Sequence, residues 1–426
     1  MLGKINIAGG KGLTGKVRVS GAKNASLPIL AATLLSETPN VIKEVPSLKD
    51  VLSMCEVLKQ IGCQVELREE GDIRIDSTNL IKYEASHDHV RKMRASFLVL
   101  GPLLARLKKA RIPMPGGCAI GSRPIDLHLK GFAALGADIN VSHGYVEASC
   151  DELIGNRVYL DFPSVGATEN LMMAATRAKG ETIIENAAEE PEVVDLANFL
   201  NKIGAKVIGA GTDTIKIEGV DQVGGTEHTV IPDRIEAGTF MAAAAISRGD
   251  VFIENVISEH IKPVIRKMEE IGLIITETEG NLRVKASGPL TPVKLKTLPY
   301  PGYPTDMQPQ MVSLLATIPG ESIVTETVFE NRFRHVEELK RMNADVTVQG
   351  NSAFINGISS LSGAPIKATD LRAGASLVLA GLAAEGNTEV CNIHHLERGY
   401  HNFVEKLIKL GAKIWKDDKN IEGVVI

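Results

Sequence analysis

The sequence predicts a mixed α/β protein of two domains, made of six copies of one repeat. Three observations carry this prediction: a helix-to-strand turn that recurs six times, a regular spacing between these turns, and one order of helices and strands around each turn. The turns centre on residue types that accept a left-handed backbone at the end of a helix. They are Gly62, Gly136, Gly204, Gly272, Asn343 and Gly411, at intervals of 74, 68, 68, 71 and 68 residues.

The helices and strands of each repeat follow the same order. A helix that is apolar on nearly every side comes first, as at 26–35 and 375–385, and such a helix is expected to be buried. A strand rich in β-branched residues follows, as at 250–253. An amphipathic helix then leads into the turn, and we expect Ser47 to cap the first of these helices. The apolar stripe holds Val51, Cys55, Leu58 and Ile61 in the first repeat, and Val264, Ile265, Met268 and Ile271 in the fourth.

Six repeats divide into two domains of three. A chain of 426 residues is too long for one ordinary core, so two domains are expected on length alone. We predict that the first domain spans 21–229 and that the second combines 1–20 with 230–426. The chain then crosses between domains near 20–22 and again near 228–232. Two such crossings would form a hinge.

Composition excludes several classes of protein. A net charge of −5 and an aromatic content of 4% argue against a nucleic-acid surface built on basic residues and base stacking. No apolar stretch reaches the length of a membrane span, and the N-terminus lacks the apolar core of a signal peptide. The five cysteines are too few and too irregular for a disulfide framework or a zinc module. We therefore expect a cytoplasmic protein without membrane insertion, nucleic-acid partner, metal or cofactor.

Charged residues stand out at the starts of the predicted helices. The free N–H groups and the dipole at a helix start favour anions, and an arginine adds a fork of donors that fits phosphate or carboxylate. One arginine at such a place is usually a solvated surface residue, but a series at equivalent positions of a repeat indicates an anion site. The series is Lys23, Arg94, Asp306 and Arg372 before apolar helices, and Arg123, Arg332 and Arg398 before amphipathic ones.

Cys118 is the second signal for chemistry. It lies in a loop rich in glycine and proline, at 113–124, which favours an exposed position. Nearby cations would lower the pKa of its thiol and make it a reactive thiolate or a usable acid, whereas the alternative is a surface thiol without a role. The other four cysteines are interpreted as small core residues. The nearby cations are Lys108, Lys109, Arg111 and Arg123.

Two other motifs are better explained by structure than by binding. The segment 10–16 approaches a P-loop, but Val17 stands where Ser or Thr would hold magnesium, so we expect a hairpin turn between short strands at 4–7 and 16–20. Those two strands precede the first repeat and are able to pair with either half of the chain. His87 and His89 lack a third ligand at suitable spacing and are expected in a solvated turn.

Five motifs together resemble the enolpyruvyl transferases, and the resemblance runs over essentially the whole chain in the family's order. It is closest to the branch that acts on UDP-N-acetylglucosamine. The motifs are SGAKNA at 20–25, GGCAIGSRP at 116–124, YPTDMQ at 303–308, FENRF at 329–333 and DLRA at 370–373.

The resemblance implies a fold and a reaction. The fold would be a two-domain inside-out α/β barrel with six βαβαββ-type repeats, three per domain, closing on the substrates. The reaction would transfer the enolpyruvyl group of phosphoenolpyruvate to the 3-hydroxyl of UDP-N-acetylglucosamine and release phosphate through a tetrahedral intermediate. This is the first committed step of peptidoglycan synthesis. Neither a cofactor nor a metal is implied, and the oligomeric state stays open.

The resemblance also assigns roles to individual residues. Lys23, Arg123 and Arg398 would hold the phosphate of phosphoenolpyruvate, and Arg332 and Arg372 would be the carboxylate and interdomain clamps. Asp306 would be the base that takes the sugar hydroxyl proton, and Cys118 the loop acid that the epoxide antibiotic fosfomycin alkylates. The UDP-sugar site would comprise Asn24, Arg94, the run Arg123, Pro124, Ile125, Asp126, Leu127 and His128, and also Ser164, Val165, Gly166 and Val328.

Two other functions compete with this one. A relative that acts on shikimate 3-phosphate would share the fold and the arginine clamp, but the Cys118 loop and the run at 123–128 favour the UDP-sugar substrate. A catalytically idle homologue that senses nucleotide sugars would be expected to lack some of the chemical residues. All four of Lys23, Cys118, Asp306 and Arg398 are present.

Overall fold

The computed structural model describes residues 3–68, 71–85, 93–115, 120–121 and 125–417. These residues divide into two compact units, each with its own hydrophobic core. The 21–231 unit comprises the described residues of 21–115 and 125–231, and the 232–426 unit comprises those of 3–20, 120–121 and 232–417.

The 21–231 unit contains three of the predicted repeats, each with helices followed by strands. Its strands form three sheets in the orders β13-β3-β5-β4, β6-β8-β7 and β11-β12-β10-β9. The elements are α1 (Lys23–Ala32), η1 (Thr33–Leu35), β3 (Asn40–Lys43), α2 (Lys49–Ile61), β4 (Gln64–Leu67), β5 (Ile73–Asp76), η3 (Arg94–Val99), α4 (Leu100–Leu107), β6 (Lys109–Pro113), α5 (Asp126–Ala134), β7 (Asp138–Ser142), β8 (Tyr145–Ser149), β9 (Arg157–Tyr159), α6 (Val165–Ala175), β10 (Glu181–Glu185), α7 (Pro191–Lys202), β11 (Lys206–Ile208), β12 (Thr214–Glu218) and β13 (Glu227–Thr229).

The 232–426 unit repeats this plan with the other three repeats. Its sheets have the orders β15-β16-β14-β2, β17-β18-β20-β19 and β21-β22-β1-β23. The elements are β1 (Lys4–Ala8), β2 (Thr14–Arg18), α8 (Arg234–Ile246), β14 (Asp250–Glu254), η4 (Ser258–Ile261), α9 (Lys262–Ile271), β15 (Ile274–Thr278), β16 (Asn281–Lys285), β17 (Lys294–Lys296), η5 (Thr305–Met307), α10 (Gln308–Leu315), β18 (Gly320–Thr325), α11 (Val336–Arg341), β19 (Asp345–Gln349), β20 (Ser352–Gly357), β21 (Pro365–Lys367), α12 (Leu371–Ala383), β22 (Asn387–Cys391), η6 (Leu396–Arg398), α13 (Phe403–Lys409) and β23 (Lys413–Asp417).

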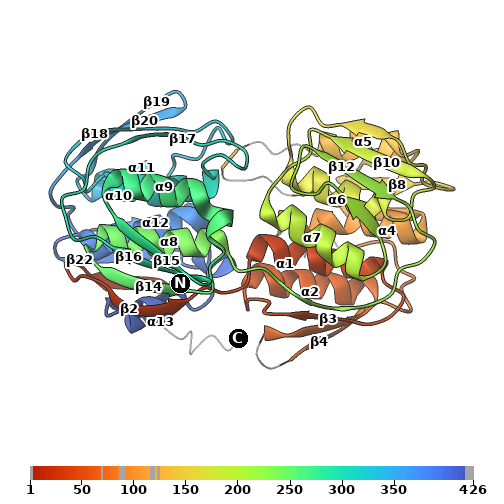
Figure 1. The fold of residues 1–426 in the computed structure, drawn as a ribbon, viewed down its shortest axis with the longest axis horizontal. Coiled ribbons are helices and arrows are strands. Elements are labelled where there is room, and N and C mark those ends of the chain that lie inside the picture. Colours follow the sequence, from red (N-terminus) through yellow and green to blue (C-terminus); the bar gives the residue numbers. More distant parts are fainter. Residues whose placement is uncertain (1–2, 69–70, 86–92, 116–119, 122–124, 418–426) are drawn as a thin grey trace, which may run out of the picture. The chain divides into compact units, whose positions relative to one another are not determined.

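Within each unit the sheets lie outside and the apolar helices inside (Figure 1). In α6, α8 and α12 nearly every residue is buried, as their all-round apolar sequences predict. The outer helices bury one stripe: Val51, Cys55, Leu58 and Ile61 of α2 are each at most 1% exposed. The expected cap at Ser47 is wrong, because α2 begins one residue later than that cap requires and its N-cap, Leu48, makes no side-chain hydrogen bond.

The six turn residues confirm the repeat. Each of them adopts a positive φ, a conformation that costs glycine little and that asparagine tolerates better than other residues with side chains. The structure therefore uses the same helix stop six times. The values of φ are 114° at Gly62, 90° at Gly136, 107° at Gly204, 110° at Gly272, 67° at Asn343 and 94° at Gly411.

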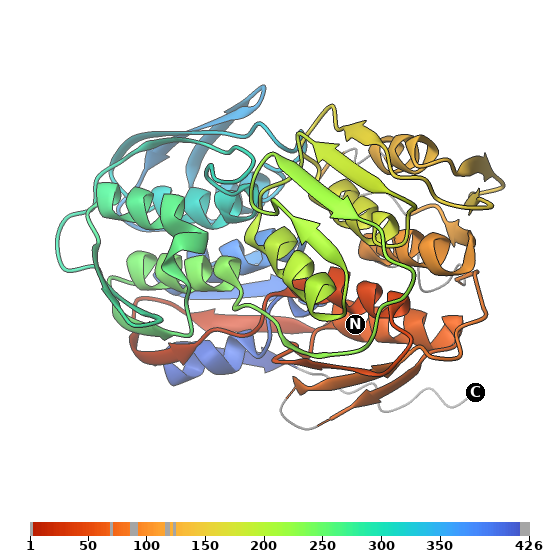
Figure 2. The same ribbon diagram turned by 45° about the vertical axis from the view of Figure 1, so that its right-hand side comes forward.

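The N-terminal strands pair in the 232–426 unit, which settles where these strands belong. β1 lies between β22 and β23, and β2 runs parallel to β14, so the first strands along the chain lie among much later ones (Figure 2). The hairpin expected at 10–16 is wrong, since β1 and β2 belong to different sheets and the segment is a connection between them. β13 takes the corresponding parallel position beside β3 in the 21–231 unit.

Candidate active site

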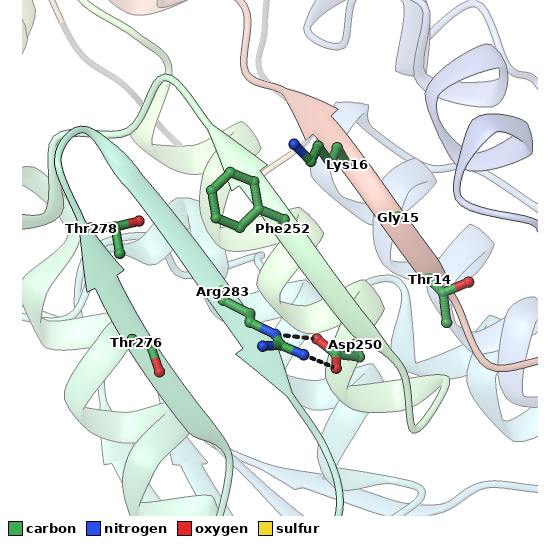
Figure 3. Close-up of a pocket in the computed structure, with 8 residues that line it drawn as sticks. All are labelled: Thr14, Gly15, Lys16, Asp250, Phe252, Thr276, Thr278 and Arg283. Carbon is green, nitrogen blue, oxygen red and sulfur yellow. Dashed lines mark hydrogen bonds and ion pairs between the residues drawn. The ribbon is translucent and has the colours of Figure 1, made fainter.

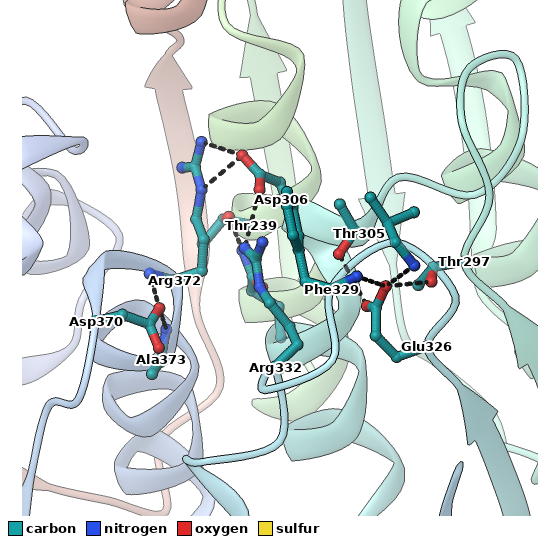
Figure 4. Close-up of polar contacts among 12 residues, drawn as sticks. Thr239, Thr297, Thr305, Asp306, Glu326, Phe329, Arg332, Asp370, Arg372 and Ala373 are labelled. Carbon is teal, nitrogen blue, oxygen red and sulfur yellow. Dashed lines mark hydrogen bonds and ion pairs between the residues drawn. The ribbon is translucent and has the colours of Figure 1, made fainter. Parts of the chain in front are cut away.

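A buried cluster of one carboxylate and two guanidinium groups lies in the 232–426 unit (Figure 4). Arg332 Nη2 is 2.9 Å from Asp306 Oδ1, and Arg372 reaches Asp306 Oδ2 with Nη2 at 3.0 Å and Nε at 3.2 Å. Both arginine side chains are 2% exposed, whereas that of Asp306 is 26% exposed. The sequence predicted all three residues for one site, and the structure brings them together.

Local sequence explains how each member reaches the cluster. Asp306 is the middle residue of the short helix η5, and this helix begins directly after Pro304. Arg372 is the second residue of α12, and the side chain of Asp370 caps this helix by accepting the N–H groups of Arg372 and Ala373 at 3.0 Å each. In the DLRA motif, Asp370 therefore caps the helix and Arg372 binds Asp306.

The charges of this cluster support one another. Burial alone would raise the pKa of Asp306, but Arg372 and Arg332 outweigh it, and the pKa lies well below its usual range. Burial disfavours the charge of Arg372, but Tyr400 and Asp306 reverse that effect and raise its pKa. Asp306 is therefore ionised at neutral pH, and as long as both guanidinium groups hold it, it is a weak base.

Three N–H bearing atoms of these arginines have no acceptor among the described residues. They are Nε and Nη1 of Arg332 and Nη1 of Arg372, all buried. A buried guanidinium donor without an acceptor is costly, so such atoms indicate a place for an anionic ligand. The geometry thus offers donors to a substrate anion beside a carboxylate able to act as a base.

Tyr400 supports Arg372 from one side. Its ring centroid lies 5.2 Å from the guanidinium carbon, a cation–π distance. Its hydroxyl is 2.9 Å from that of Thr239 and accepts a hydrogen bond from Gln310 Nε2 at 3.1 Å. Tyr400 was not predicted for the site, because nothing in the repeat pattern distinguishes it from other core aromatics.

Two further predicted residues lie in the same unit. Arg398 ends the short helix η6, and Val328 donates its N–H to Glu326 Oε1 at 2.7 Å. The described flank of the Cys118 loop also belongs here: Ile120 accepts the N–H of Asn331 at 3.0 Å, and a side chain on Gly121 would collide with Glu330. Residues 120–121 therefore lie beside the turn that carries Arg332.

Cys118, Arg123 and Pro124 themselves lie outside the described residues. Of the cations expected to activate Cys118, Arg111 forms ion pairs with Glu84 and Glu147, so its charge is shared with two carboxylates. The interpretation of four cysteines as core residues is confirmed for Cys55 and Cys63, whereas Cys150 and Cys391 are only partly buried. Burial raises the pKa of Cys55 and of Cys63 to about 12.

Lys23 opens α1 in the 21–231 unit and is 9% exposed. Its Nζ forms an ion pair with Oδ2 of Asp50 at 2.9 Å, and Asp50 lies in the first turn of α2 with 4% exposure. Asn24 follows Lys23 and is half-buried. Asp50 was not predicted for the site, although an acidic residue in a first helical turn was an available signal.

The predicted UDP-sugar residues of this unit that the structure describes lie at the starts of four helices, α1, η3, α5 and α6. Ser164 caps α6, accepting the N–H of Ala167 at 3.4 Å, so that Val165 and Gly166 form the first turn. Ile125 is the N-cap of α5, Asp126 is its first residue, and Leu127 and His128 follow within its first turn. Gly166 lies against His128, since a Cβ there would be 3.4 Å from the imidazole. The runs 125–128 and 164–166 are thus neighbours.

Asn170 joins α5 and α6 to the helix that Arg94 opens. Its amide nitrogen is 3.2 Å from His128 Nδ1 and donates to the carbonyl of Phe97 at 3.1 Å, while its Oδ1 accepts the N–H of Gly101 at 2.8 Å. Arg94 is the first residue of η3 and is half-buried. Asn170 was missed because it lies inside an apolar helix, away from the motifs.

A shallow hollow on the outer face of one sheet contains none of the predicted residues (Figure 3). Lys16, Phe252 and Arg283 line part of it, on β2, β14 and β16. Arg283 is already paired with Asp250 by two hydrogen bonds of 2.9 and 2.8 Å. Within the described part of the chain no helix meets the length and apolarity of a membrane span, and no cluster of metal-ligating residues occurs.

Comparisons with known proteins agree with the geometry. The profile of the EPSP synthase (3-phosphoshikimate 1-carboxyvinyltransferase) family matches residues 7–407. A protein of Carboxydothermus hydrogenoformans named UDP-N-acetylglucosamine 1-carboxyvinyltransferase 2 is 60% identical over 96% of this chain and 98% of its own. A UDP-N-acetylglucosamine 1-carboxyvinyltransferase of Halothermothrix orenii is 56% identical over 97% of this chain and 100% of its own.

Solved structures confirm the predicted fold class. The enolpyruvyl transferase NikO from Streptomyces tendae is similar with a TM-score of 0.87 and 26% identity over 97% of this chain and 99% of its own. EPSP synthase from Acinetobacter baumannii shares the fold with a TM-score of 0.76 at 20% identity over the same shares. The chain belongs to the enolpyruvyl transferase family, in the group of the UDP-N-acetylglucosamine 1-carboxyvinyltransferases.

Proposed function

We propose that this protein transfers the enolpyruvyl group of phosphoenolpyruvate to the 3-hydroxyl of UDP-N-acetylglucosamine and releases phosphate. The reaction is an addition followed by an elimination, through a tetrahedral intermediate, and it is the first committed step of peptidoglycan synthesis. The observation that carries the proposal is the identity of 56–60% over nearly the whole chain with transferases named for this substrate. The buried Asp306–Arg332–Arg372 cluster supports it with suitable chemistry.

Phosphoenolpyruvate is an anion that the arginine donors suit. The N–H groups of Arg332 and Arg372 that have no acceptor among the described residues favour its carboxylate, and Lys23, Arg123 and Arg398 are assigned to its phosphate. A substrate anion that takes over these guanidinium groups weakens their hold on Asp306. The pKa of Asp306 then rises, because the charges that lowered it are partly neutralised. The substrate thereby makes Asp306 a better base for the 3-hydroxyl.

The remaining roles follow the sequence motifs. Cys118 is the acid that protonates the methylene carbon, and it is the group that fosfomycin alkylates. The UDP-sugar binds at Asn24, Arg94, Val328 and the runs 123–128 and 164–166, where the α6 cap exposes first-turn N–H groups to an anion. The two domains are 21–229 and 1–20 with 230–426, and the protein works in the cytoplasm without nucleic acid or metal.

The test is phosphate release from phosphoenolpyruvate with each candidate acceptor. Release with UDP-N-acetylglucosamine and none with shikimate 3-phosphate is expected, and fosfomycin should abolish it while adding one molecule's mass to the peptide that contains Cys118. Release with shikimate 3-phosphate alone would assign the other transferase activity. An absence of release with both acceptors would leave only a binding role.

A further inference from the structure

Glu326 is a buried carboxylate to which the proposed reaction assigns no task. It follows β18, is 3% exposed and accepts four hydrogen bonds (Figure 4). Its Oε1 accepts from the hydroxyl of Thr297 at 2.8 Å and from the N–H groups of Val328 and Phe329 at 2.7 and 3.2 Å. Its Oε2 accepts from the hydroxyl of Thr305 at 2.8 Å.

These four donors come from three separate segments. Thr297 follows β17, Thr305 begins the turn of Asp306, and residues 328–329 begin the loop that leads to Arg332. Thr297 and the loop are joined again, because Thr327 donates its N–H to the Thr297 hydroxyl at 3.0 Å and its own hydroxyl to the Thr297 carbonyl at 2.6 Å. Glu326 therefore ties the turn of Asp306 to the loop that carries its ion-pair partner.

The four contacts suit a carboxylate, which can accept hydrogen bonds with both of its oxygens. Every partner that the structure gives the Glu326 carboxylate is a donor, two hydroxyls and two backbone N–H groups, and the carboxylate offers both oxygens to them. A buried loop N–H without an acceptor would be costly. The hydrogen bonds of Glu326 also connect two parts of the proposed active site, since Thr305 adjoins Asp306 and Val328 belongs to the proposed UDP-sugar site.

We propose that Glu326 is a positioning residue of the transfer reaction: it holds the Asp306 turn and the Val328–Arg332 loop in the register that the base requires. This role rests on the proposed function. Glu326 does not contact the substrates in this proposal, and it influences the reaction through its hydrogen bonds to Thr305 and Val328. Removing the Thr305 hydroxyl frees the base turn but leaves three of the four contacts, so its effect should fall on turnover more than on substrate binding.

The experiment compares Thr305→Val with a matched control, Thr325→Val. Thr325 is one residue before Glu326, and its hydroxyl contacts Ser352 Oγ at 2.9 Å, outside the Glu326 network. Because small errors in the position of a catalytic group cost large factors in rate, Thr305→Val should lower kcat by about tenfold to a hundredfold, with KM for UDP-N-acetylglucosamine within about twofold. Thr325→Val should keep kcat within about twofold.

Glu326 itself supplies the second comparison. In Glu326→Gln the amide oxygen can occupy the Oε1 position and the amide nitrogen can donate to the Thr305 hydroxyl, so this variant should keep more than a tenth of wild-type kcat. Glu326→Ala should lose at least as much as Thr305→Val. Equal kcat values for Thr305→Val and Thr325→Val would overturn the role even with a fully active wild type. A wild type that releases no phosphate would instead overturn the proposed function, and this role with it.

Discussion

Arg372 grips Asp306 through two of its nitrogens, Nη2 at 3.0 Å and Nε at 3.2 Å from the same carboxylate oxygen. Arg332 holds the other oxygen. The base of the proposed reaction is thus held in ion pairs by both guanidinium groups. In such a cluster Asp306 stays a weak base until an anion competes for the guanidinium groups and its pKa rises.

Asp306→Asn should destabilise the protein by about 3 to 5 kcal/mol near pH 7, because it leaves two buried guanidinium groups without a counter-charge. The pKa of Asp306 is depressed in the folded chain, so its contribution is fully present above the unfolded pKa of about 3.9 and declines as the pH falls below it. Urea unfolding of both proteins from pH 8 to pH 3 measures this. A difference that already shrinks between pH 8 and pH 5 would contradict the depressed pKa.

Lys23 and Asp50 should prove energetically coupled. Both side chains are at most 11% exposed, so removing either partner takes a close counter-charge from a buried charge and should cost about 3 kcal/mol. Removing both should cost less than the sum, by about 1 to 3 kcal/mol. A double-mutant cycle of Lys23→Ala and Asp50→Ala, read by urea unfolding, tests this. Additive losses would show that the ion pair contributes nothing beyond its separate members.

Asn170→Ala should weaken the UDP-sugar site without touching the base. Its loss leaves the buried N–H of Gly101 without its side-chain acceptor and takes one of two donors from the carbonyl of Phe97, at about 1 to 3 kcal/mol of stability. We expect a higher KM for UDP-N-acetylglucosamine with kcat nearly unchanged. Asn140→Ala, at an exposed position of β7 in the same unit, is the control and should leave stability within about 0.5 kcal/mol. A fall in kcat at constant KM would show that Asn170 does not support the UDP-sugar site.

Glu169 should make the protein less stable as the pH rises. It is 3% exposed, and burial, with Glu192 and Glu190 nearby, raises its pKa well above the usual value. Between the unfolded pKa of about 4.3 and the raised folded one, the folded chain holds a proton that the unfolded chain has lost. Stability should therefore decline with pH in this window, and less steeply in Glu169→Gln. Parallel pH profiles for the two proteins would refute the assignment.

Local signals in the sequence predicted much of this structure. The turn residues, from Gly62 to Gly411, can be recognised in the sequence because few residue types tolerate a positive φ. The all-round apolar helices and the charges before them are equally local, and they pointed to Asp306, Arg332 and Arg372. A repeat made these patterns easier to find, since each was present in several copies.

What escaped prediction depends on contacts between distant segments. β1 and β2 belong to different sheets, and each pairs with strands that lie hundreds of residues later in the chain. The short segment between β1 and β2 does not encode these pairings. Asp50, Asn170 and Glu326 act through partners in other elements, and their own neighbourhoods look like ordinary helix or strand sequence. Long-range hydrogen bonds of this kind leave no periodic trace in a single sequence.

The central claim is that Asp306, held by Arg332 and Arg372, is the base of enolpyruvyl transfer to UDP-N-acetylglucosamine. The most direct measurement is kcat for phosphate release by Asp306→Asn, with both substrates saturating. Loss of a general base predicts a fall of about a hundredfold to ten-thousandfold, with phosphoenolpyruvate still bound. A variant that turns over at the wild-type rate would contradict the account.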